Sequence, residues 1–286
     1  MLKQDAVLNW YTEDANKYLI LHLWGSNMTK HGYIKFLGTA GGRFVVAKQL
    51  RSSAGTFISA KGKNVIVDPG PGTLVRSAAS RPRIDVSKLD AIILTHAHLD
   101  HSNDVNVLID AITEGGLKKR GTLFAPDDCL NGDNAVVLKY LRDYLKDIVI
   151  LKENSEYRLD DLTFKTSVKH EHGVETYGVK FDLDGTKVSF MVDTKFFPQL
   201  IASYADSDIL VLNVVMDKYH PEYGDILHLY SEDAVNIIKT IKPQKAILTH
   251  FGMAMLKTKP WVLAKKLSDE LGIDVVAASD GMKIEV

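Results

Sequence analysis

In this chain of 286 residues, positions 95–101 read Thr-His-Ala-His-Leu-Asp-His. An apolar run directly before them predicts a strand, so we expect the polar residues to lie where a strand of a sheet ends. Imidazole and carboxylate groups are ligands for Zn²⁺, Fe and Mn. His96 and His98 are two positions apart and point the same way in an extended segment, whereas Asp100 and His101 follow the turn and can face a second ion. The stretch therefore predicts a site for two metal ions.

The same stretch resembles the His-x-His-x-Asp-His signature of the metallo-β-lactamase superfamily. The resemblance implies an α/β fold, a four-layer αβ/βα sandwich of two mixed sheets flanked by helices, with a dinuclear metal site at one edge between the stacked sheets. It extends over about residues 33–286, so we expect these residues to form a single domain. Residues 1–32 lie outside it and stay unassigned, either as a strap along the core or as a contact between subunits.

Further positions along the chain match the remaining residues of the family's metal site. An apolar strand that ends in Asp68 matches the structural aspartate that supports the metal loop. The implied ligands are, for the first metal, His96, His98 and His172, for the second metal, Asp100, His101 and His250, and, as the bridge between them, Asp193. His170 is the alternative to His172, because both would share one face of a strand, and the spacing to Thr176 and Gly178 favours His172.

The predicted metal pair determines the chemistry that we expect. Two cations about 3.5–4 Å apart share a water molecule and lower its pKa towards neutrality, so that a bridging hydroxide can attack the substrate. Asp100 is predicted both to bind a metal and to orient this hydroxide. Two carboxylates and no cysteine ligand favour Zn²⁺, and Mn²⁺ or Fe are the alternatives.

His228 distinguishes between branches of the superfamily. It stands just before a predicted helix, and a histidine at this point is typical of tRNase Z and the related cyclic-phosphate phosphodiesterases, where it acts as a general acid. An imidazole there can protonate a departing alkoxide. The alternative is that His228 only caps or packs against the start of the helix. Asn213 departs from the pattern of tRNase Z, which has an acidic residue or a neighbouring histidine in this region.

The resemblance and the net charge together predict the substrate class. Only residues 173–192 separate His172 from Asp193, where full-length tRNase Z carries a long basic insertion that docks tRNA, and the formal net charge is −1. Both observations argue against nucleic acid as a partner. We therefore expect hydrolysis of a small phosphodiester or cyclic phosphate. Hydrolysis of a lactone, ester or thioester, of the glyoxalase II or lactonase type, is the alternative, and a non-catalytic metal-binding scaffold is the alternative of another class.

Composition predicts a cytoplasmic enzyme that acts on small molecules. Cys129 is the single cysteine, which excludes an internal disulfide and fits a reducing compartment. No apolar run approaches the roughly 20 residues of a membrane span, and the N-terminal region is not typical of a secretory signal. The chain could form a homo-oligomer, because Trp10, Tyr11 and Trp24 in the N-terminal segment could cover a neighbouring subunit. Arg51 is a candidate phosphate contact, with a solvated loop as the alternative.

Local patterns predict the elements that carry this site. The expected strands are 33–37, 44–47, 56–59, 64–67, 89–95, 163–168, 178–183, 187–192, 245–249, 273–277 and 283–286, with the last two closing the second sheet. The expected helices are 105–112, 133–145, 231–241 and 260–271. Asp184 and Gly185 predict a hairpin turn, and Ser231 predicts the N-terminal cap of its helix.

Overall fold

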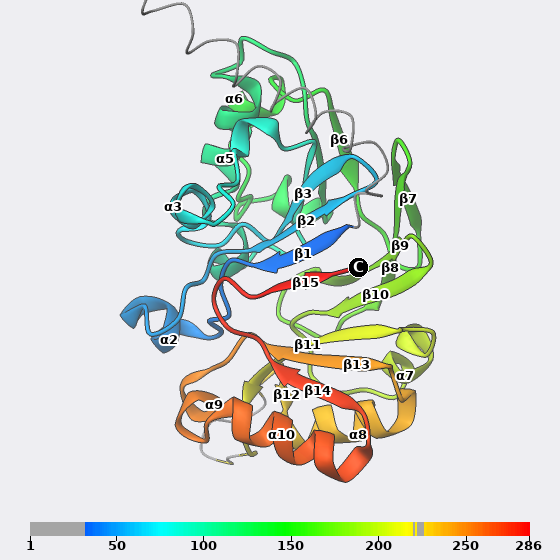
Figure 1. Cartoon of the computed structure of the whole chain (residues 1–286). Helices are drawn as coiled ribbons and strands as arrows, with labels where there is room; N and C mark the ends of the chain where they lie inside the picture. Colours follow the sequence, from blue (N-terminus) through cyan, green and yellow to red (C-terminus); the bar gives the residue numbers. More distant parts are fainter. Residues whose placement is uncertain (1–31, 220, 222–225) are drawn as a thin grey trace, which may run out of the picture. The chain divides into compact units, whose positions relative to one another are not determined.

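A computed structural model describes residues 32–219, 221 and 226–286. The expectations for residues 1–32, including a subunit contact through Trp10, Tyr11 and Trp24, concern residues that, apart from Gly32, lie outside the described ones. By its contacts Gly32–Val286 forms one compact unit. This unit contains two β-sheets with helices on their outer faces (Figure 1).

Each sheet joins a parallel part to an antiparallel part. The first sheet has the order β15 (Lys283–Glu285), β1 (Tyr33–Phe36), β2 (Thr56–Ala60), β3 (Lys63–Val67), β4 (Ala91–Ile93), β5 (Thr122–Ala125) and β6 (Asp147–Ile150). The second has the order β14 (Asp274–Ala277), β13 (Lys245–Thr249), β11 (Ile209–Met216), β10 (Thr186–Met191), β9 (Tyr177–Leu183), β8 (Leu162–Lys169) and β7 (Glu156–Leu159), with β12 (Leu229–Tyr230) paired to β11. Strands β3 to β6 are parallel, as are β10, β11, β13 and β14.

The helices form the two outer layers. On the first sheet's side lie α3 (Thr73–Ala79), α5 (Val105–Thr113) and α6 (Lys139–Arg142), with 3₁₀ turns at Val86–Lys88 and Asp127–Cys129. Helix α2 (Arg43–Lys48) lies apart from them, at the left of Figure 1, and the short α4 (Leu99–Ser102) comes directly before α5 in the chain. On the second sheet's side lie α7 (Gln199–Tyr204), α8 (Ser231–Ile241), α9 (Met253–Lys257) and α10 (Pro260–Leu271). One apolar cluster fills the space between the sheets, and one lies under each helical layer. The expected four-layer αβ/βα sandwich is therefore confirmed.

The strand pattern explains where polar residues gather. Strand β4 is buried at every position, and β11 is apolar along both faces except at Asn213, as expected for strands covered by a layer on each side. Asp68, Asp193 and His250 each follow the carboxyl end of a parallel strand, and the loop that begins with Thr95 follows β4. Because parallel strands end at one edge of a sheet, this topology brings the predicted site residues together.

Three of the elements predicted from the sequence differ from the structure, in type, in sheet or in length. Residues 44–47 belong to helix α2 and not to a strand, because both hydrogen-bonding edges of β1 are already occupied by β15 and β2. Strand β15 pairs with β1 in the first sheet, so the prediction that 283–286 closes the second sheet is wrong. The helix expected over 133–145 is limited to α6, because Val136 and Val137 donate backbone hydrogen bonds to Cys129 and Leu138 donates one to Asn106.

The remaining boundaries agree with the sequence pattern, with one difference at a helix cap. Strand β13 and helix α10 begin and end as expected, and the turn residues Asp184 and Gly185 have φ of 54° and 91°. Ser231 is the first residue of α8, but its hydroxyl donates to the carbonyl of Asp217 instead of capping the helix. The N-terminus of α8 is capped by Asp233, whose carboxylate accepts the backbone N–H of Tyr230.

A glycine-rich loop after β1 holds the strand end that carries His250. Gly41 donates its backbone N–H to Phe251 at 3.0 Å, and Phe251 donates to Thr39 at 2.8 Å. A Cβ atom at position 41 would lie 2.2 Å from the carbonyl oxygen of His250 and 2.6 Å from Cδ2 of its ring. His250 itself has φ of 58°, in the left-handed region, so its backbone is already held in an unfavourable conformation. The loop therefore needs glycine at position 41.

Gly41→Ala is expected to destabilise the protein by about 1–3 kcal/mol, the range typical of overpacking, because the methyl group collides with the backbone and ring of His250. Thermal or urea unfolding measures the effect. Gly173→Ala is the matched control, because a Cβ there meets no described atom within 4 Å and the backbone is not in the left-handed region. Equal stability of the two variants would contradict the close approach at Gly41.

Candidate metal centre

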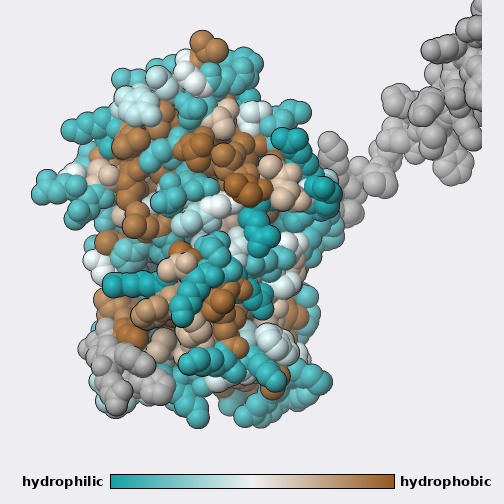
Figure 2. Space-filling model, turned by 90° about the vertical axis from the view of Figure 1, so that its left-hand side faces the viewer, coloured by the Kyte–Doolittle hydropathy of each residue, from teal (hydrophilic) through white to brown (hydrophobic). Residues whose placement is uncertain are grey.

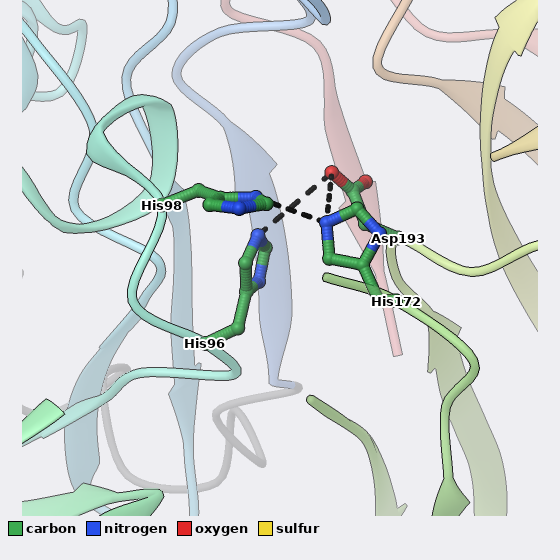
Figure 3. A group of neighbouring side chains, drawn as sticks. All are labelled: His96, His98, His172 and Asp193. Atoms are coloured by element: carbon green, nitrogen blue, oxygen red, sulfur yellow. Dashed lines mark hydrogen bonds and ion pairs between the residues drawn. The ribbon is translucent and has the colours of Figure 1, made fainter. Parts of the chain in front are cut away.

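The first group of predicted ligands converges in the structure. One ligand atom from each of four residues, His96, His98, His172 and Asp193, lies within 4.8 Å of the others (Figure 3). Nε2 of His172 lies 2.9 Å from Nδ1 of His98 and 3.9 Å from Oδ2 of Asp193, and Nε2 of His96 lies 3.8 Å from the same carboxylate oxygen. Residues nearly 100 positions apart in the chain thus face one point in space.

The second group lies beside the first and shares the carboxylate of Asp193. Ligand atoms of Asp100, His101 and His250 also lie within 4.8 Å of one another. Oδ2 of Asp193 lies 3.3 Å from Nε2 of His101, and Oδ1 lies 3.3 Å from Nε2 of His250. The Asp193 carboxylate therefore reaches both groups, as a bridging ligand must.

The unpaired nitrogen atoms of this site fit two metal ions. Nε2 of His96, His101 and His250 is buried and lacks a hydrogen-bond partner within residues 32–219, 221 and 226–286. A buried polar atom without a partner costs free energy, so such atoms call for an explanation. Imidazole nitrogen and carboxylate oxygen are the donors that divalent transition metals take, and these donors point at two neighbouring positions. The residues present fit a pair of cations.

Protonation of the histidines follows from their surroundings. Burial lowers the pKa of His96 well below its usual value, so this imidazole stays neutral, the form that binds a metal. Burial also lowers the pKa of His101, but the carboxylates of Asp193, Asp100 and Asp68 outweigh it and hold that pKa well above the usual value. A cation at the second position would take the place of this proton next to the carboxylates.

Asp68 supports the metal loop from behind. Its Oδ1 accepts the backbone N–H of Thr95 at 2.7 Å, and its Oδ2 accepts the Thr95 hydroxyl at 2.7 Å and lies 2.9 Å from Nδ1 of His101. If Nδ1 of His101 donates to this carboxylate, Nε2 carries the lone pair that faces the site. Asp68 has φ of 51°, so a second residue of the centre has a strained backbone.

Asp68→Asn is expected to weaken metal binding by about 10–100-fold, the range typical of residues that orient a ligand from behind. The amide loses the charge-assisted bonds to Thr95 and His101 while keeping the shape of the side chain. Competition with a chelator of known affinity measures the change. Asp90→Asn is the matched control, because the Asp90 carboxylate also accepts a backbone N–H, the partly buried one of Asn64 at 2.9 Å, but lies at the far end of the same strands. Unchanged affinity in Asp68→Asn would contradict this supporting role.

His170 is turned away from the metal centre. Its Nε2 lies 2.9 Å from the Tyr204 hydroxyl and its Nδ1 lies 3.2 Å from the backbone carbonyl of Asp193. Burial lowers the pKa of His170 to about 4, so the ring is neutral at physiological pH. Its neighbour His172 occupies the position beside His98. The structure thus separates the two alternatives that the sequence left open.

Asn213 has a role that the sequence did not reveal. Its Nδ2 donates to Oδ1 of Asp193 at 2.8 Å, from the neighbouring strand β11. The bond holds the carboxylate in the orientation that reaches both ligand groups. The available signal was a single amide within the apolar strand Ile209–Met216, at the height where β10 ends.

His228 faces the centre from the segment before α8. Its Nδ1 lies 3.6 Å from Oδ2 of Asp193, and its ring centroid lies 5.0 Å from that of His172. The adjacent carbonyl of Leu227 lies 2.9 Å from Nδ1 of His172, so a hydrogen bond fixes this segment to a predicted ligand. Because the helix start is capped by Asp233 and Tyr230, His228 does not serve as the cap.

Two further residues noted in the sequence lie outside the two ligand groups. Arg51 donates to the Thr39 hydroxyl at 3.4 Å, within the loop that also contacts Phe251. Cys129 is buried, and burial raises the pKa of its thiol, so it is an unreactive core residue. Among the described helices, none combines the length and apolar composition needed to cross a membrane.

Comparison with known proteins agrees with this architecture. The family model described as a β-lactamase superfamily domain matches residues 63–251. A protein of Methanocaldococcus jannaschii, MJ1374, is 33% identical over 260 residues, covering 88% of this chain and 94% of its own. This relative thus aligns with most of the chain and with nearly its own full length.

Solved structures share the same fold at lower sequence identity. The metallo-β-lactamase fold protein YhfI from Bacillus subtilis has a TM-score of 0.73 at 19% identity, covering 90% of this chain and 100% of that chain. A diphosphatase of the PhnP family has a TM-score of 0.64 at 23% identity, covering 90% and 97%. The short form of human tRNase Z has a TM-score of 0.62 at 17% identity, covering 89% and 99%. This chain therefore belongs to the β-lactamase superfamily and is a metal-dependent hydrolase of the metallo-β-lactamase fold.

Proposed function

We propose that this hydrolase binds two divalent cations and cleaves a small phosphodiester, such as a cyclic phosphate. Zn²⁺ is the metal we expect, with Mn²⁺ and Fe as alternatives, because the donors are imidazole and carboxylate without thiolate. The first cation would be bound by His96, His98 and His172. The second would be bound by Asp100, His101 and His250. The carboxylate of Asp193 would contact both cations.

The bound cations would supply an activated water and offset the charge that develops on the substrate's phosphate oxygens. The protein's own groups orient the reaction. Asp100 keeps its Oδ2 at 3.7 Å from Nε2 of His250 and 3.8 Å from Nε2 of His101, so its carboxylate is placed to accept a hydrogen bond from the attacking water. A water held in this way has fewer orientations to lose on the way to the transition state.

His228 is the observation that favours a phosphodiester. Its Nδ1 is buried, has no hydrogen-bond partner in the described part of the chain, and lies 3.6 Å from Oδ2 of Asp193. A protonated imidazole in this position can give its proton to a departing alkoxide, which is a poor leaving group without one. Hydrolysis of an activated aryl ester or a thioester has less need of such an acid, because the leaving group is a weaker base. The placement of His228 thus supports cleavage of an unactivated phosphodiester.

A pocket beside the centre suits a small substrate. It has a volume of about 560 Å³ and is lined by Ala97, His98, Leu99, Ser102, Asn103, Asn106, Asn134, Ala135, Val136 and Val174. Pockets of roughly 300–1,000 Å³ are typical of small-molecule sites. Leu99 is 69% exposed. We infer that the substrate carries an apolar or flat group that packs on the apolar part of this lining, which includes Leu99, Val136 and Val174. Hydrophobic residues also gather elsewhere at the surface, as the upper half of the face in Figure 2 shows.

Two observations argue against nucleic acid as the substrate. Between His172 and Asp193 the chain contains only strands β9 and β10 and their turn, so it carries no docking arm in that interval. The formal net charge of −1 supports the same view. The names of two structural neighbours, a diphosphatase and a tRNase, both describe hydrolysis at phosphorus, which supports the reaction type. We also propose a cytoplasmic location, because a single buried cysteine that forms no disulfide fits a reducing compartment.

A substrate panel tests the proposed function. Protein loaded with Zn²⁺, Mn²⁺ or Fe²⁺ is assayed with an aryl phosphodiester, a cyclic nucleotide, an aryl ester, a lactone and a thioester. We expect the highest kcat/KM on a phosphodiester, at least tenfold above the carboxylic substrates, which is a difference of about 1.4 kcal/mol in transition-state binding. A preference for the lactone or thioester would favour the alternative hydrolase. Loaded protein that turned over none of them would contradict the proposal.

A further inference from the structure

A second pocket lies on the outer side of the first sheet, next to α3. It has a volume of about 290 Å³, and its lining residues are Lys35, Leu37, Arg76, Ala79, Ser80, Arg81, Asp280 and Gly281. These described lining residues include no member of either ligand group of the metal centre. The pocket is thus separate from the proposed reaction site.

The pocket has an excess of positive charge. Lys35, Arg76 and Arg81 are cationic, and Asp280 is the single acidic residue among the described lining residues. Asp280 is already engaged, since its carboxylate accepts hydrogen bonds from the Thr39 hydroxyl at 2.7 Å, from the backbone of Ser52 at 2.7 Å and from Arg76 at 3.1 Å. It therefore neutralises Arg76 and leaves the charges of Lys35 and Arg81 without a carboxylate in the pocket.

The buried position of the Lys35 ammonium group destabilises the protein. It is only 6% exposed, and one bond of its ammonium, to the carbonyl of Arg81 at 2.8 Å, is formed within the described residues, although an ammonium has three donors. Lys283 stands directly opposite on β15, and like charges at such cross-strand positions repel. Burial and this neighbour lower the pKa of Lys35. A bound anion would relieve both the desolvation and the repulsion.

Ser80 adds an unused donor to the same pocket. It follows the last residue of α3, is 8% exposed, and its hydroxyl has no hydrogen-bond partner among residues 32–219, 221 and 226–286. Arg81 donates through one nitrogen, Nη1, to the carbonyls of Ala79 and Ser80, which leaves its other N–H groups for a ligand. A hydroxyl, an ammonium and a guanidinium together are a donor set suited to phosphate oxygens.

Another pocket in the same molecule shows that this excess is not a general property of the surface. It has three lysines, Lys165, Lys180 and Lys187, and three acidic residues, Glu156, Asp182 and Asp206. Lys165 pairs with Glu156 at 3.3 Å and Lys187 with Asp206 at 3.5 Å. There two of the three lysines have carboxylate partners, and the numbers of acidic and basic residues are equal, whereas Lys35 and Arg81 have no carboxylate partner in their pocket.

We propose that the pocket formed by Lys35, Ser80 and Arg81 binds the phosphate group of a small phosphorylated molecule. The three side chains contact the phosphate oxygens, and Arg76, which is 47% exposed in its side chain, stands at the rim where the rest of the ligand leaves the pocket. Binding here is independent of the reaction proposed for the metal centre.

Equilibrium dialysis with labelled inorganic phosphate tests this site in the metal-loaded protein. The metal centre can also bind phosphate, so the measure is the difference between variants. Lys35→Met is expected to lose one phosphate per chain, or to bind it about tenfold or more weakly, since bonds to a charged group are among the strong ones. Lys180→Met is the matched control, because the half-buried Lys180 also donates to a backbone carbonyl, that of Ser203 at 2.7 Å, but belongs to the balanced pocket.

Ser80→Ala provides the second variant. It removes a hydroxyl without a described partner, so we expect an unchanged melting temperature together with several-fold weaker phosphate binding. Phosphate bound equally by wild type, Lys35→Met and Ser80→Ala would overturn the proposal. Loss of phosphate in Lys180→Met to the same extent would overturn it as well. Because binding is measured directly, the outcome does not depend on whether the metal centre cleaves phosphodiesters.

Discussion

Asp193→Asn should abolish hydrolysis, with a loss larger than the roughly 100-fold upper range for residues that only orient a ligand. The carboxylate is 2% exposed and lies 3.3 Å from Nε2 of both His101 and His250. Burial raises the pKa of this carboxyl, but the surrounding histidines outweigh it and hold that pKa well below the usual value, so the group is an anion. An amide of the same shape has no charge to offer either cation, and both metal positions should therefore weaken together. Metal content and kcat/KM on the best phosphodiester measure the two losses.

Asp208→Asn is the matched control for this substitution. The Asp208 carboxylate also accepts hydrogen bonds in the second sheet, from the backbone of Lys187 at 2.8 Å and from Gln244 at 2.8 Å, but it precedes strand β11 at the end remote from Asn213. We expect wild-type metal content and activity in this variant. Two bound metals and near-normal turnover in Asp193→Asn would contradict the bridging role.

His228→Ala should slow cleavage of a phosphodiester with an alkoxide leaving group by about 10²–10⁴-fold, the range typical of general acid catalysis. The reason is that Nδ1 of His228, 3.6 Å from Oδ2 of Asp193, faces the centre without another hydrogen-bond partner in the described chain. For a substrate that releases p-nitrophenolate, which departs without a proton, the loss should be small. The measurement is kcat/KM of the wild type and of His228→Ala on a pair of phosphodiesters that differ in the leaving group alone.

The activated substrate serves as the internal control, because it reports on metal binding and folding in the same protein sample. Metal content should equal that of the wild type, since His228 is not one of the proposed ligands. Equal losses on the two substrates would remove the general acid role and leave His228 as a residue that binds the phosphate. No loss on either would show that the segment before α8 takes no part in the reaction.

Much of the candidate metal centre was predictable, because its proposed ligands lie in short, recognisable stretches. His96, His98, Asp100 and His101 lie within six positions after an apolar strand, and such a pattern needs no knowledge of the rest of the chain. The more distant positions were found through their resemblance to a family pattern, and the structure brings all seven predicted side chains into two adjacent groups. The choice between His170 and His172 depended on the path of one loop, which periodicity does not describe.

Other features depended on contacts between distant segments. Arg43–Lys48 contains two adjacent valines and a phenylalanine, which favours a strand, yet it forms a helix because the neighbouring strand has no free edge. The helix predicted over 133–145 is shorter in the structure, because backbone N–H groups of this stretch donate to the carbonyl of Cys129 and to the side-chain oxygen of Asn106. In both cases hydrogen bonds formed by other parts of the sheet or loop outweighed local propensity, which is weak.

From the sequence alone it was determined that this protein is a layered α/β hydrolase with two clustered sets of metal donors, since strand periodicity and ligand spacing are local properties of the chain. The tertiary structure alone decided that Asn213 orients the Asp193 carboxylate, that the last strand joins the first sheet, and that Lys35, Ser80 and Arg81 share one pocket. These relations join residues on different strands and loops. Their distances depend on how the two sheets stack and pair, and that arrangement results from the burial of apolar side chains throughout the domain.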